Sequence, residues 1–281
     1  MDLRALVASD EADVRELMGR CLDRDGGLPM ATEPKMLRQL FFEGEGVCAE
    51  SAGGGLVAVG ALGSPTAGDR EFMGVVDPGH RGQGLGTSLL SWAADEAGTG
   101  LVVRSESLSD AAVQLFSRLG FHSVLEEVVM RRSMTTLPPE GRFEEYQTWT
   151  SRSARLFFEA YVASFESRPG FPGWPLDRWV RRVTNDDDFS AESSIVVLSS
   201  GSPVGFLLVA GAWIDQLGVV PASRRRGIGS ELVCFALHRI SEAGAEAAWL
   251  NVGANNPRAA SLYRRLGFED YGRRGRFRRP G

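Results

Sequence analysis

Cysteine is scarce in this sequence, and long hydrophobic runs are missing. The three cysteines, Cys21, Cys48 and Cys234, lie far apart and form no CxxC pair, which favours small buried side chains over a catalytic thiol. No apolar run approaches the roughly 18 residues that a membrane-spanning helix needs, and residues 1–4 do not begin a signal peptide. We therefore expect a cytoplasmic protein with no role in a membrane.

An excess of positive charge is also missing. The formal net charge is −5, with 43% hydrophobic and 24% charged residues, which is a globular composition. A protein that binds nucleic acid or a membrane surface through its overall charge would be basic. We therefore expect neither nucleic acid nor a membrane as a partner.

What the sequence does contain is an internal repeat. Residues 76–87 and residues 219–230 both place an Arg three positions after a Pro, and a Gly-x-Gly pair three positions after that Arg. The two prolines, Pro78 and Pro221, stand about half a chain length apart. A chain of 281 residues allows one large or two ordinary domains, and the repeat favours two.

The pattern of strands and helices supports this division. In the first half the apolar spacing predicts the order β-α-α-β-β-β-α-β-α-β, and the second half repeats it. The predicted strands are 3–7, 47–51, 56–62, 71–76, 101–104 and 124–131, and the helices are 12–21, 33–42, 87–97 and 110–119. The Pro-rich segment 138–142 reads as a linker between domains 1–137 and 143–281. We expect an α/β fold with a mixed sheet in each half.

Each copy of the repeat is a turn from a strand into a helix. Glycines such as Gly227 and Gly229 let the backbone approach a ligand, and the first N–H groups of the helix suit a phosphate oxygen. The neighbouring arginines add positive charge. The turn fits neither the Gly-x-Gly-x-x-Gly dinucleotide pattern nor the P-loop pattern.

Two motifs of the second half resemble those of the GNAT superfamily of N-acetyltransferases. Its acyl-CoA motif, Arg or Gln followed by x-x-Gly-x-Gly/Ala, matches residues 224–229. Its later motif, Asn-x-x-Ala-x-x-Leu-Tyr followed by Leu-Gly-Phe, matches Asn256, Ala259, Leu262 and Tyr263 with residues 266–268. The resemblance covers both halves and implies two tandem acyltransferase-type domains.

The resemblance also implies an acetyl-CoA site with no metal. Main-chain groups of the turn would hold the pyrophosphate, and those of Leu217 and Val219 would hold the pantetheine arm and the acyl carbonyl. Asn256 would bind the coenzyme or cap its helix. The expected coenzyme residues in the second half are Leu217, Val219, Arg224, Arg225, Arg226, Gly227, Ile228, Gly229, Ser230 and Asn256. Those in the first half are Val76, Arg81, Gly82, Gln83, Gly84, Leu85, Gly86 and Thr87.

Acyl transfer to an amine needs a base for the amine and an acid for the leaving thiolate. Tyr263, a phenol with an ordinary pKa of about 10, is the candidate acid, the alternative being a core aromatic. Asp215 is the candidate base, because period-two alternation puts it on the face of Leu217 and Val219. The alternative is an Asp that faces solvent or pairs with an Arg.

The first half departs from the motif where the chemistry lies. Phe116 stands at the position of Tyr263, Ser109 at that of Asn256, and counting back from the prolines puts Phe72 at that of Asp215. A phenylalanine cannot donate a proton. We expect the first half to have a structural or regulatory role, with or without bound acyl-CoA.

The expected activity is acetyl transfer from acetyl-CoA to a primary amine of a small molecule, directly within a ternary complex, by a monomer or homodimer. One alternative is a non-catalytic sensor or scaffold that binds acyl-CoA. Another is an enzyme that acetylates a protein or peptide amine.

Overall fold

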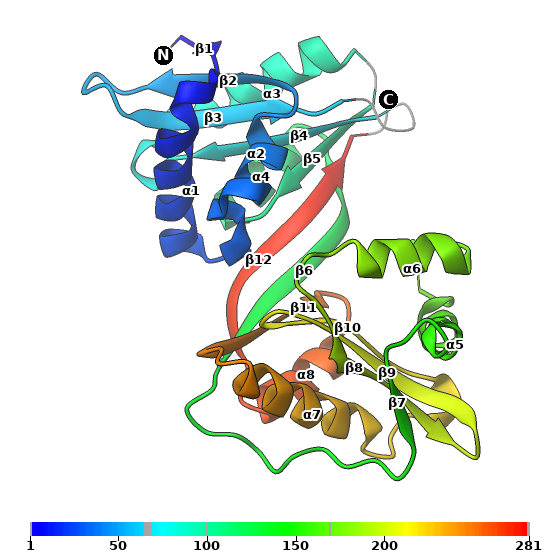
Figure 1. The fold of residues 1–281 in the computed structure, drawn as a ribbon. Helices are drawn as coiled ribbons and strands as arrows, with labels where there is room; N and C mark the ends of the chain where they lie inside the picture. Colours follow the sequence, from blue (N-terminus) through cyan, green and yellow to red (C-terminus); the bar gives the residue numbers. More distant parts are fainter. Residues whose placement is uncertain (1, 65–68, 99, 169, 280–281) are drawn as a thin grey trace. The chain divides into compact units, whose positions relative to one another are not determined.

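The computed structural model describes residues 2–64, 69–98, 100–168 and 170–279 (Figure 1). The chain forms two compact units. The first comprises Met1–Val129, Gly253–Asn255 and Asp270–Gly281, and the second comprises Met130–Val252 and Asn256–Glu269. The element order predicted from the sequence is confirmed in both halves.

The elements of the first half run from β1 to β6. They are β1 (Arg4–Ala5), α1 (Glu11–Asp25), α2 (Pro34–Phe41), β2 (Glu45–Glu50), β3 (Leu56–Leu62), β4 (Arg70–Val76), α3 (Leu85–Ala97), β5 (Leu101–Ser105), α4 (Asp110–Arg118) and β6 (His122–Ser133). Those of the second half are β7 (Tyr146–Thr148), α5 (Ala154–Phe165), α6 (Leu176–Thr184), β8 (Phe189–Ser199), β9 (Ser202–Ala210), β10 (Trp213–Val219), α7 (Ile228–Glu242), β11 (Ala247–Gly253), α8 (Pro257–Arg265) and β12 (Glu269–Arg278).

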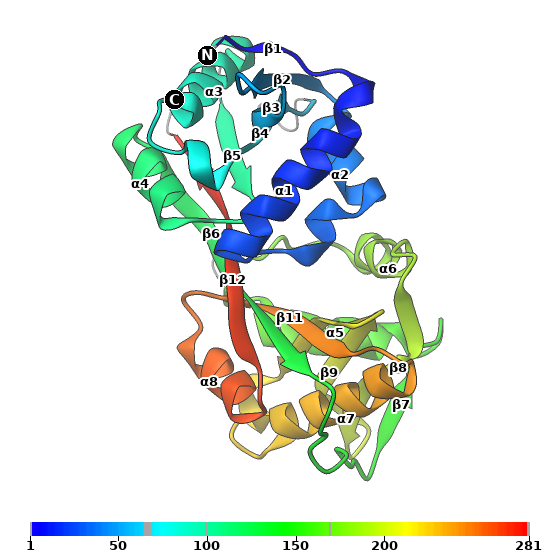
Figure 2. The ribbon, with the colours of Figure 1, turned by 90° about the vertical axis from the view of Figure 1, so that its left-hand side faces the viewer.

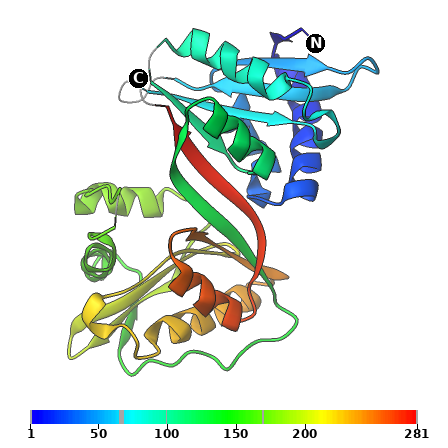
Figure 3. The same ribbon diagram turned by 180° about the vertical axis from the view of Figure 1, so that it is seen from behind.

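In the first unit the hydrogen-bonded strands follow the order β1-β2-β3-β4-β5-β12-β6. Helices α1 and α2 cover one face of this sheet and α3 and α4 the other (Figures 1 and 3). The two faces have separate apolar cores, one around Leu17, Leu37 and Phe41, and the other around Phe72, Leu89 and Phe116. The sheet is therefore buried on both sides.

The last strand of the chain belongs to the first unit, which differs from the sequence-based boundaries at 137 and 143. Strand β12 pairs antiparallel with β5, from Gly275↔Ser105 to Arg278↔Val102. The second unit in turn begins at Met130 and therefore contains the end of β6. Each half thus completes its sheet with a strand of the other half's sequence.

In the second unit the strand order is β6-β11-β10-β9-β8-β7. Figure 2 shows β11, β9, β8 and β7 of this sheet with α7 beside them. Helices α5 and α6 pack on one face through an aromatic core that includes Phe157, Trp179 and Phe206. Helix α7 lies on the opposite face, where a Cβ at Gly205 would stand 3.1 Å from Ile228. Among the described residues, no helix is long and apolar enough to cross a membrane.

Candidate active site

The repeated turn has the same backbone shape in both halves. Helix α7 begins after Gly227 at φ 87°, and α3 begins after Gly84 at φ 87°. Two residues earlier, Arg225 has a φ of 68° where the first half has Gly82 at 78°. Left-handed residues in such a turn direct successive N–H groups into a concave anion site. A Cβ at Gly227 would meet no described atom within 4 Å, so the space beside this turn is open to a ligand.

The first arginine of each turn holds the turn together. Arg224 donates from Nε to the carbonyl of Val219 (3.0 Å) and from a terminal nitrogen to the carbonyl of Ser164 (3.2 Å). In the first half Arg81 donates to the carbonyl of Val76 (3.3 Å) and forms a two-pronged ion pair with Asp25. Arg81 thus connects the end of β4 to α1, and Arg224 connects the end of β10 to α5. Arg224 and Arg81 therefore have a structural function in the turn.

A β-bulge divides the central strand of the second half. The register between β10 and β9 shifts between Ile214 and Gln216, which leaves Asp215 as the extra residue. On the other side, β10 pairs with β11 only at Trp213↔Trp249 and Ile214↔Leu250. The two parallel strands therefore separate just beyond the bulge, beside the turn that starts α7.

The first half has no such bulge, and this corrects the residue match made from the sequence. Pairing between β4 and β3 is continuous from Phe72↔Leu62 to Val76↔Ala58. The register therefore matches Phe72 with Ile214, so Asp215 is an insertion. The alternation that placed Asp215 beside Leu217 and Val219 does not hold through the bulge, because one extra residue interrupts the period of two.

Asp215 lies at the bulge with its residue exposed to solvent. The surrounding protein removes part of its hydration, which raises the pKa of its carboxyl above the usual 3.8, and Asp186 raises it further while Arg182 opposes the rise. Direct exposure limits the size of this effect. Gln216 donates from Nε2 to Asp215 Oδ2 at 3.3 Å, which holds the carboxylate in place.

Tyr263 projects from α8 and is 8% exposed. Burial raises its pKa to about 12, against the opposing charge of Arg168, so the phenol stays protonated at neutral pH. Asn256 caps this helix by accepting a hydrogen bond from the Ala259 N–H (3.3 Å), and its contact with the coenzyme stays a prediction. In the first half Ser109 caps α4 in the same way, and the buried Phe116 takes the tyrosine's place.

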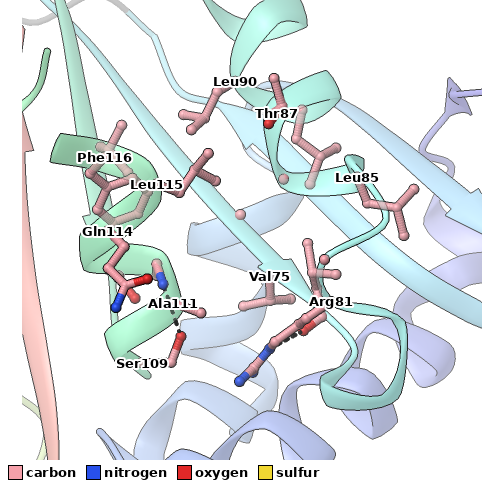
Figure 4. A pocket seen from close by; sticks show the side chains of 18 of the residues that line it. Val75, Arg81, Leu85, Thr87, Leu90, Ser109, Ala111, Gln114, Leu115 and Phe116 are labelled. Carbon is pink, nitrogen blue, oxygen red and sulfur yellow. Dashed lines mark hydrogen bonds between the residues drawn. The ribbon is translucent and has the colours of Figure 1, made fainter. Parts of the chain in front are cut away.

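The first half contains a cavity of about 420 Å³ between β4, α3 and α4 (Figure 4). The expected coenzyme residues that line it are Val76, Arg81, Gly82, Gly84, Leu85, Gly86 and Thr87, whereas the exposed Gln83 lies outside the lining. Ser109, which caps α4, closes the cavity together with Gln114, Leu115 and Phe116 of that helix. The turn of the first half thus opens onto a space large enough for part of a coenzyme.

One charged residue near Tyr263 gave no signal in the sequence. The Arg168 guanidinium lies 4.0 Å from the centre of the Phe165 ring, and its charge acts on Tyr263. Burial lowers the pKa of Arg168. Arg168 lies in a loop without helical or strand periodicity, so no spacing connects it with Tyr263.

Comparisons with known proteins agree with this geometry. A model described as Acetyltransferase (GNAT) family matches residues 153–268, and one described as Acetyltransferase (GNAT) domain matches residues 43–123. Mycothiol acetyltransferase of Thermobispora bispora is 30% identical over 211 residues, covering 69% of this chain and 70% of the relative. That of Nocardia farcinica is 29% identical over 282 residues, covering 91% and 89%.

Solved structures repeat the arrangement over the full chain. A GCN5-related N-acetyltransferase from Sphaerobacter thermophilus has a TM-score of 0.78 and 25% identity, covering 100% of this chain and 96% of its own. A tandem GNAT protein from the clavulanic acid biosynthesis pathway has a TM-score of 0.63 and 15% identity, covering 99% and 97%. The second likeness concerns the fold alone.

Proposed function

The chain belongs to the GNAT family of acetyltransferases, with two domains of that type in tandem, and from this we propose that its second half transfers an acetyl group from acetyl-CoA to a primary amine of a small molecule. The observation that carries the proposal is the bulge at Asp215 beside the turn that starts α7. It opens β10 from β11 next to the place where backbone N–H groups suit a pyrophosphate. The first half has the turn without the bulge, and its strands β4 and β5 stay paired one residue further, to Met73↔Arg104, before they separate.

The proposed chemistry is direct transfer between two bound reactants. Asp215 accepts a proton from the amine, whose nitrogen forms a bond to the acetyl carbonyl carbon as the carbon–sulfur bond breaks. Tyr263 gives its proton to the departing thiolate and regains one through water. Holding the reactants in contact supplies most of the rate.

We propose mycothiol lacking its acetyl group as the first acceptor to test, because the relatives that match most of the chain are named mycothiol acetyltransferases. The names of these relatives support a small-molecule acceptor. A panel of other primary amines, including a peptide N-terminus, separates a small-molecule enzyme from one that acetylates proteins.

The first half is proposed to bind acyl-CoA without reacting. Its cavity and turn suit the coenzyme, but Phe116 offers no proton and β4 has no bulge. Mass spectrometry of the native protein with acetyl-CoA should show two bound equivalents, and the substitution Gly84→Asp, which puts negative charge at the turn, should remove one. A single equivalent in the unaltered protein would refute this role.

The test of the catalytic assignment compares two reciprocal variants. Tyr263→Phe should lower kcat for coenzyme A release by roughly 100-fold, the usual contribution of a general acid. Phe116→Tyr should leave kcat unchanged. Full activity in Tyr263→Phe would refute the role of Tyr263, and absence of amine-dependent coenzyme A release from the unaltered protein would favour a non-catalytic sensor.

A further inference from the structure

Three buried polar atoms lie on one face of β10 and β11 without hydrogen-bond partners among the described residues. They are Gln216 Oε1, Asn251 Oδ1 and Ser164 Oγ. Buried polar atoms in folded proteins are nearly always hydrogen-bonded, and leaving one unpaired costs free energy. Three together call for a functional explanation.

The strand registers place these atoms on the same face. Because Ile214 pairs with Val209 and Gln216 with Leu208, Gln216 points to the side opposite Ile214. Asn251 follows Leu250, the partner of Ile214, so it shares the face of Gln216. A Cβ at Gly218 would lie 2.8 Å from Ser164 Oγ, which sets Ser164 against that face as well.

The three residues also lie where the strands separate. The pairing of β10 with β11 ends at Ile214↔Leu250, and Gln216 and Asn251 are the next residues of that face on either side of the opening. Ser164 belongs to α5, which covers this face, and is 2% exposed. Gln216 also holds the Asp215 carboxylate, the proposed base.

The first half provides an internal comparison. By equal spacing from the repeated turn and the later motif, Met73 corresponds to Gln216, Arg104 to Asn251 and Cys21 to Ser164. Met73 is 2% exposed in the apolar core, and Cys21 Sγ donates weakly to the Val76 carbonyl at 3.5 Å. Arg104 is ion-paired with Glu106 and Glu71. The three unpaired polar atoms of the second half therefore have no unpaired counterparts at the matching positions of the first half, which has no bulge.

We infer that Gln216, Asn251 and Ser164 form the acceptor subsite and select an amine that carries further hydrogen-bond donors. This inference rests on the proposed acetyltransferase activity. Gln216 Oε1 and Asn251 Oδ1 only accept hydrogen bonds, and Ser164 Oγ can accept one. A molecule with hydroxyl or N–H groups next to its amine satisfies them, whereas an apolar amine leaves them buried and unpaired.

The test uses two amines with one carbon skeleton, 2-amino-1,3-propanediol and isopropylamine. The unaltered protein should acetylate the diol with a kcat/KM roughly tenfold or more above that of isopropylamine, since a site built for hydrogen bonds rejects an analogue without them. Gln216→Met and Asn251→Leu should each reduce this preference, roughly three- to tenfold for one lost hydrogen bond. The KM for acetyl-CoA should stay the same, and Met73→Leu in the first half is the matched control.

Thermal unfolding separates recognition from a structural role. Replacing an unpaired buried oxygen by an apolar group of similar size should leave Tm unchanged or raise it. Gln216→Met also removes the hydrogen bond from Nε2 to Asp215, so the decision rests on Asn251→Leu. A lowered Tm in Asn251→Leu would show that this side chain supports the fold, and would overturn the inference.

Two further outcomes distinguish this inference from the proposed function. Equal kcat/KM for both amines in the unaltered protein would overturn the subsite and leave the acetyltransferase activity standing. If neither amine is acetylated, calorimetry with coenzyme A present decides: tighter binding of the diol that is lost in Gln216→Met supports the subsite, and equal binding of both amines overturns it.

Discussion

Arg225 is the residue at which the two turns differ most in the free-energy cost of their backbone conformation. It adopts a φ of 68°, whereas the first half has Gly82 at 78°. A side chain in this region costs about 1–2 kcal/mol, and Gly avoids that cost. An arginine kept in such a position is consistent with use of its charge beside a phosphate.

We therefore expect Arg225→Gly to have opposite effects on stability and binding. It should raise the free energy of unfolding by about 1 kcal/mol, as urea denaturation measures. It should also raise the KM for acetyl-CoA several-fold by removing a charge from the turn. Arg226→Gly is the control, because Arg226 is not among the positive-φ residues and its replacement relieves no such strain. An unchanged KM in Arg225→Gly would exclude a phosphate contact.

Ionisation of the Asp215 carboxyl should set the acidic limb of the pH–rate profile. Its pKa is raised mainly by desolvation, so kcat/KM should increase with pH through a value above the usual 3.8. Asp215→Asn should remove this limb and lower kcat at neutral pH by roughly 100-fold. A pH profile unchanged by the substitution would identify another base.

Asp215→Asn should stabilise the folded state at neutral pH although it lowers the activity. A raised carboxyl pKa means that the folded state disfavours the charge. Stability therefore falls as pH rises from the unfolded value through the folded one, and the loss persists at neutral pH. Asp215→Asn should then raise the free energy of unfolding at pH 7 and leave it unchanged well below pH 3.8. A destabilised variant at pH 7 would place Asp215 in a structural ion pair.

The candidate residues were predictable from the sequence only in part. Tyr263 and Asn256 stand in a motif of fixed spacing, so their positions follow from the family pattern. The polar atoms of Gln216 and Asn251 did not stand out, because they are left unpaired by the separation of two strands. In the second half that separation begins at a bulge, which has no local signature in the apolar run 213–220.

The central strands show why element boundaries are easier to predict than register. The expected strand 71–76 corresponds to β4 at Arg70–Val76, and the expected helix 87–97 to α3 at Leu85–Ala97. In the second half the strand expected before the repeated turn is β10 at Trp213–Val219, yet its one extra residue changes which side chains face each other. A bulge preserves the apolar composition of a strand, so periodicity over a few residues does not reveal it.

Deleting Asp215 should convert β10 into a regular strand like β4. Ile214 and Gln216 then become neighbours opposite Val209 and Leu208, so the side chains keep their faces while the opening to β11 narrows. We expect the deletion to abolish amine-dependent coenzyme A release and to keep acetyl-CoA binding, measured by calorimetry, within a few-fold. Asp215→Asn, which keeps the bulge, is the control. Equal residual activity in both variants would mean that the bulge adds nothing to the carboxylate.

At the scale of the whole chain, the repeat predicted two units but not the exchange of their last strands. Strand β12 contains few apolar residues in alternation, with Phe277 as its one large core side chain. Its sequence is instead rich in arginine. Arg273 pairs with Asp110, Arg274 with Glu106, Arg276 with Glu71 and Arg278 with Asp69, all in the first unit. Ion pairs between residues that lie far apart in the sequence leave no periodic signal in it.

The ion pair of Glu106 should be the strongest of these attachments. Glu106 is fully buried, Arg274 Nε lies 3.0 Å from its Oε2, and Arg104 binds its other oxygen. Glu106→Gln removes the charge that both guanidinium groups face. Breaking a buried pair in this way lowers the free energy of unfolding by about 3–5 kcal/mol. The pair of Arg273 with Asp110 is the matched control, because the Asp110 side chain is 86% exposed and such a pair contributes at most about 1 kcal/mol.

Hydrogen exchange can localise the effect of that substitution. In Glu106→Gln, amides of β5 and β12 should lose protection together, because the two strands are paired from Gly275↔Ser105 to Arg278↔Val102. Asp110→Asn should leave both protected, and peptides from β8 and β9 in the second unit should exchange at the original rate in both variants. If β5 stays protected while β12 opens, the first unit does not depend on the last strand of the chain. Equal loss in the two variants would show that burial of Glu106 gives its ion pairs no special weight in holding that strand.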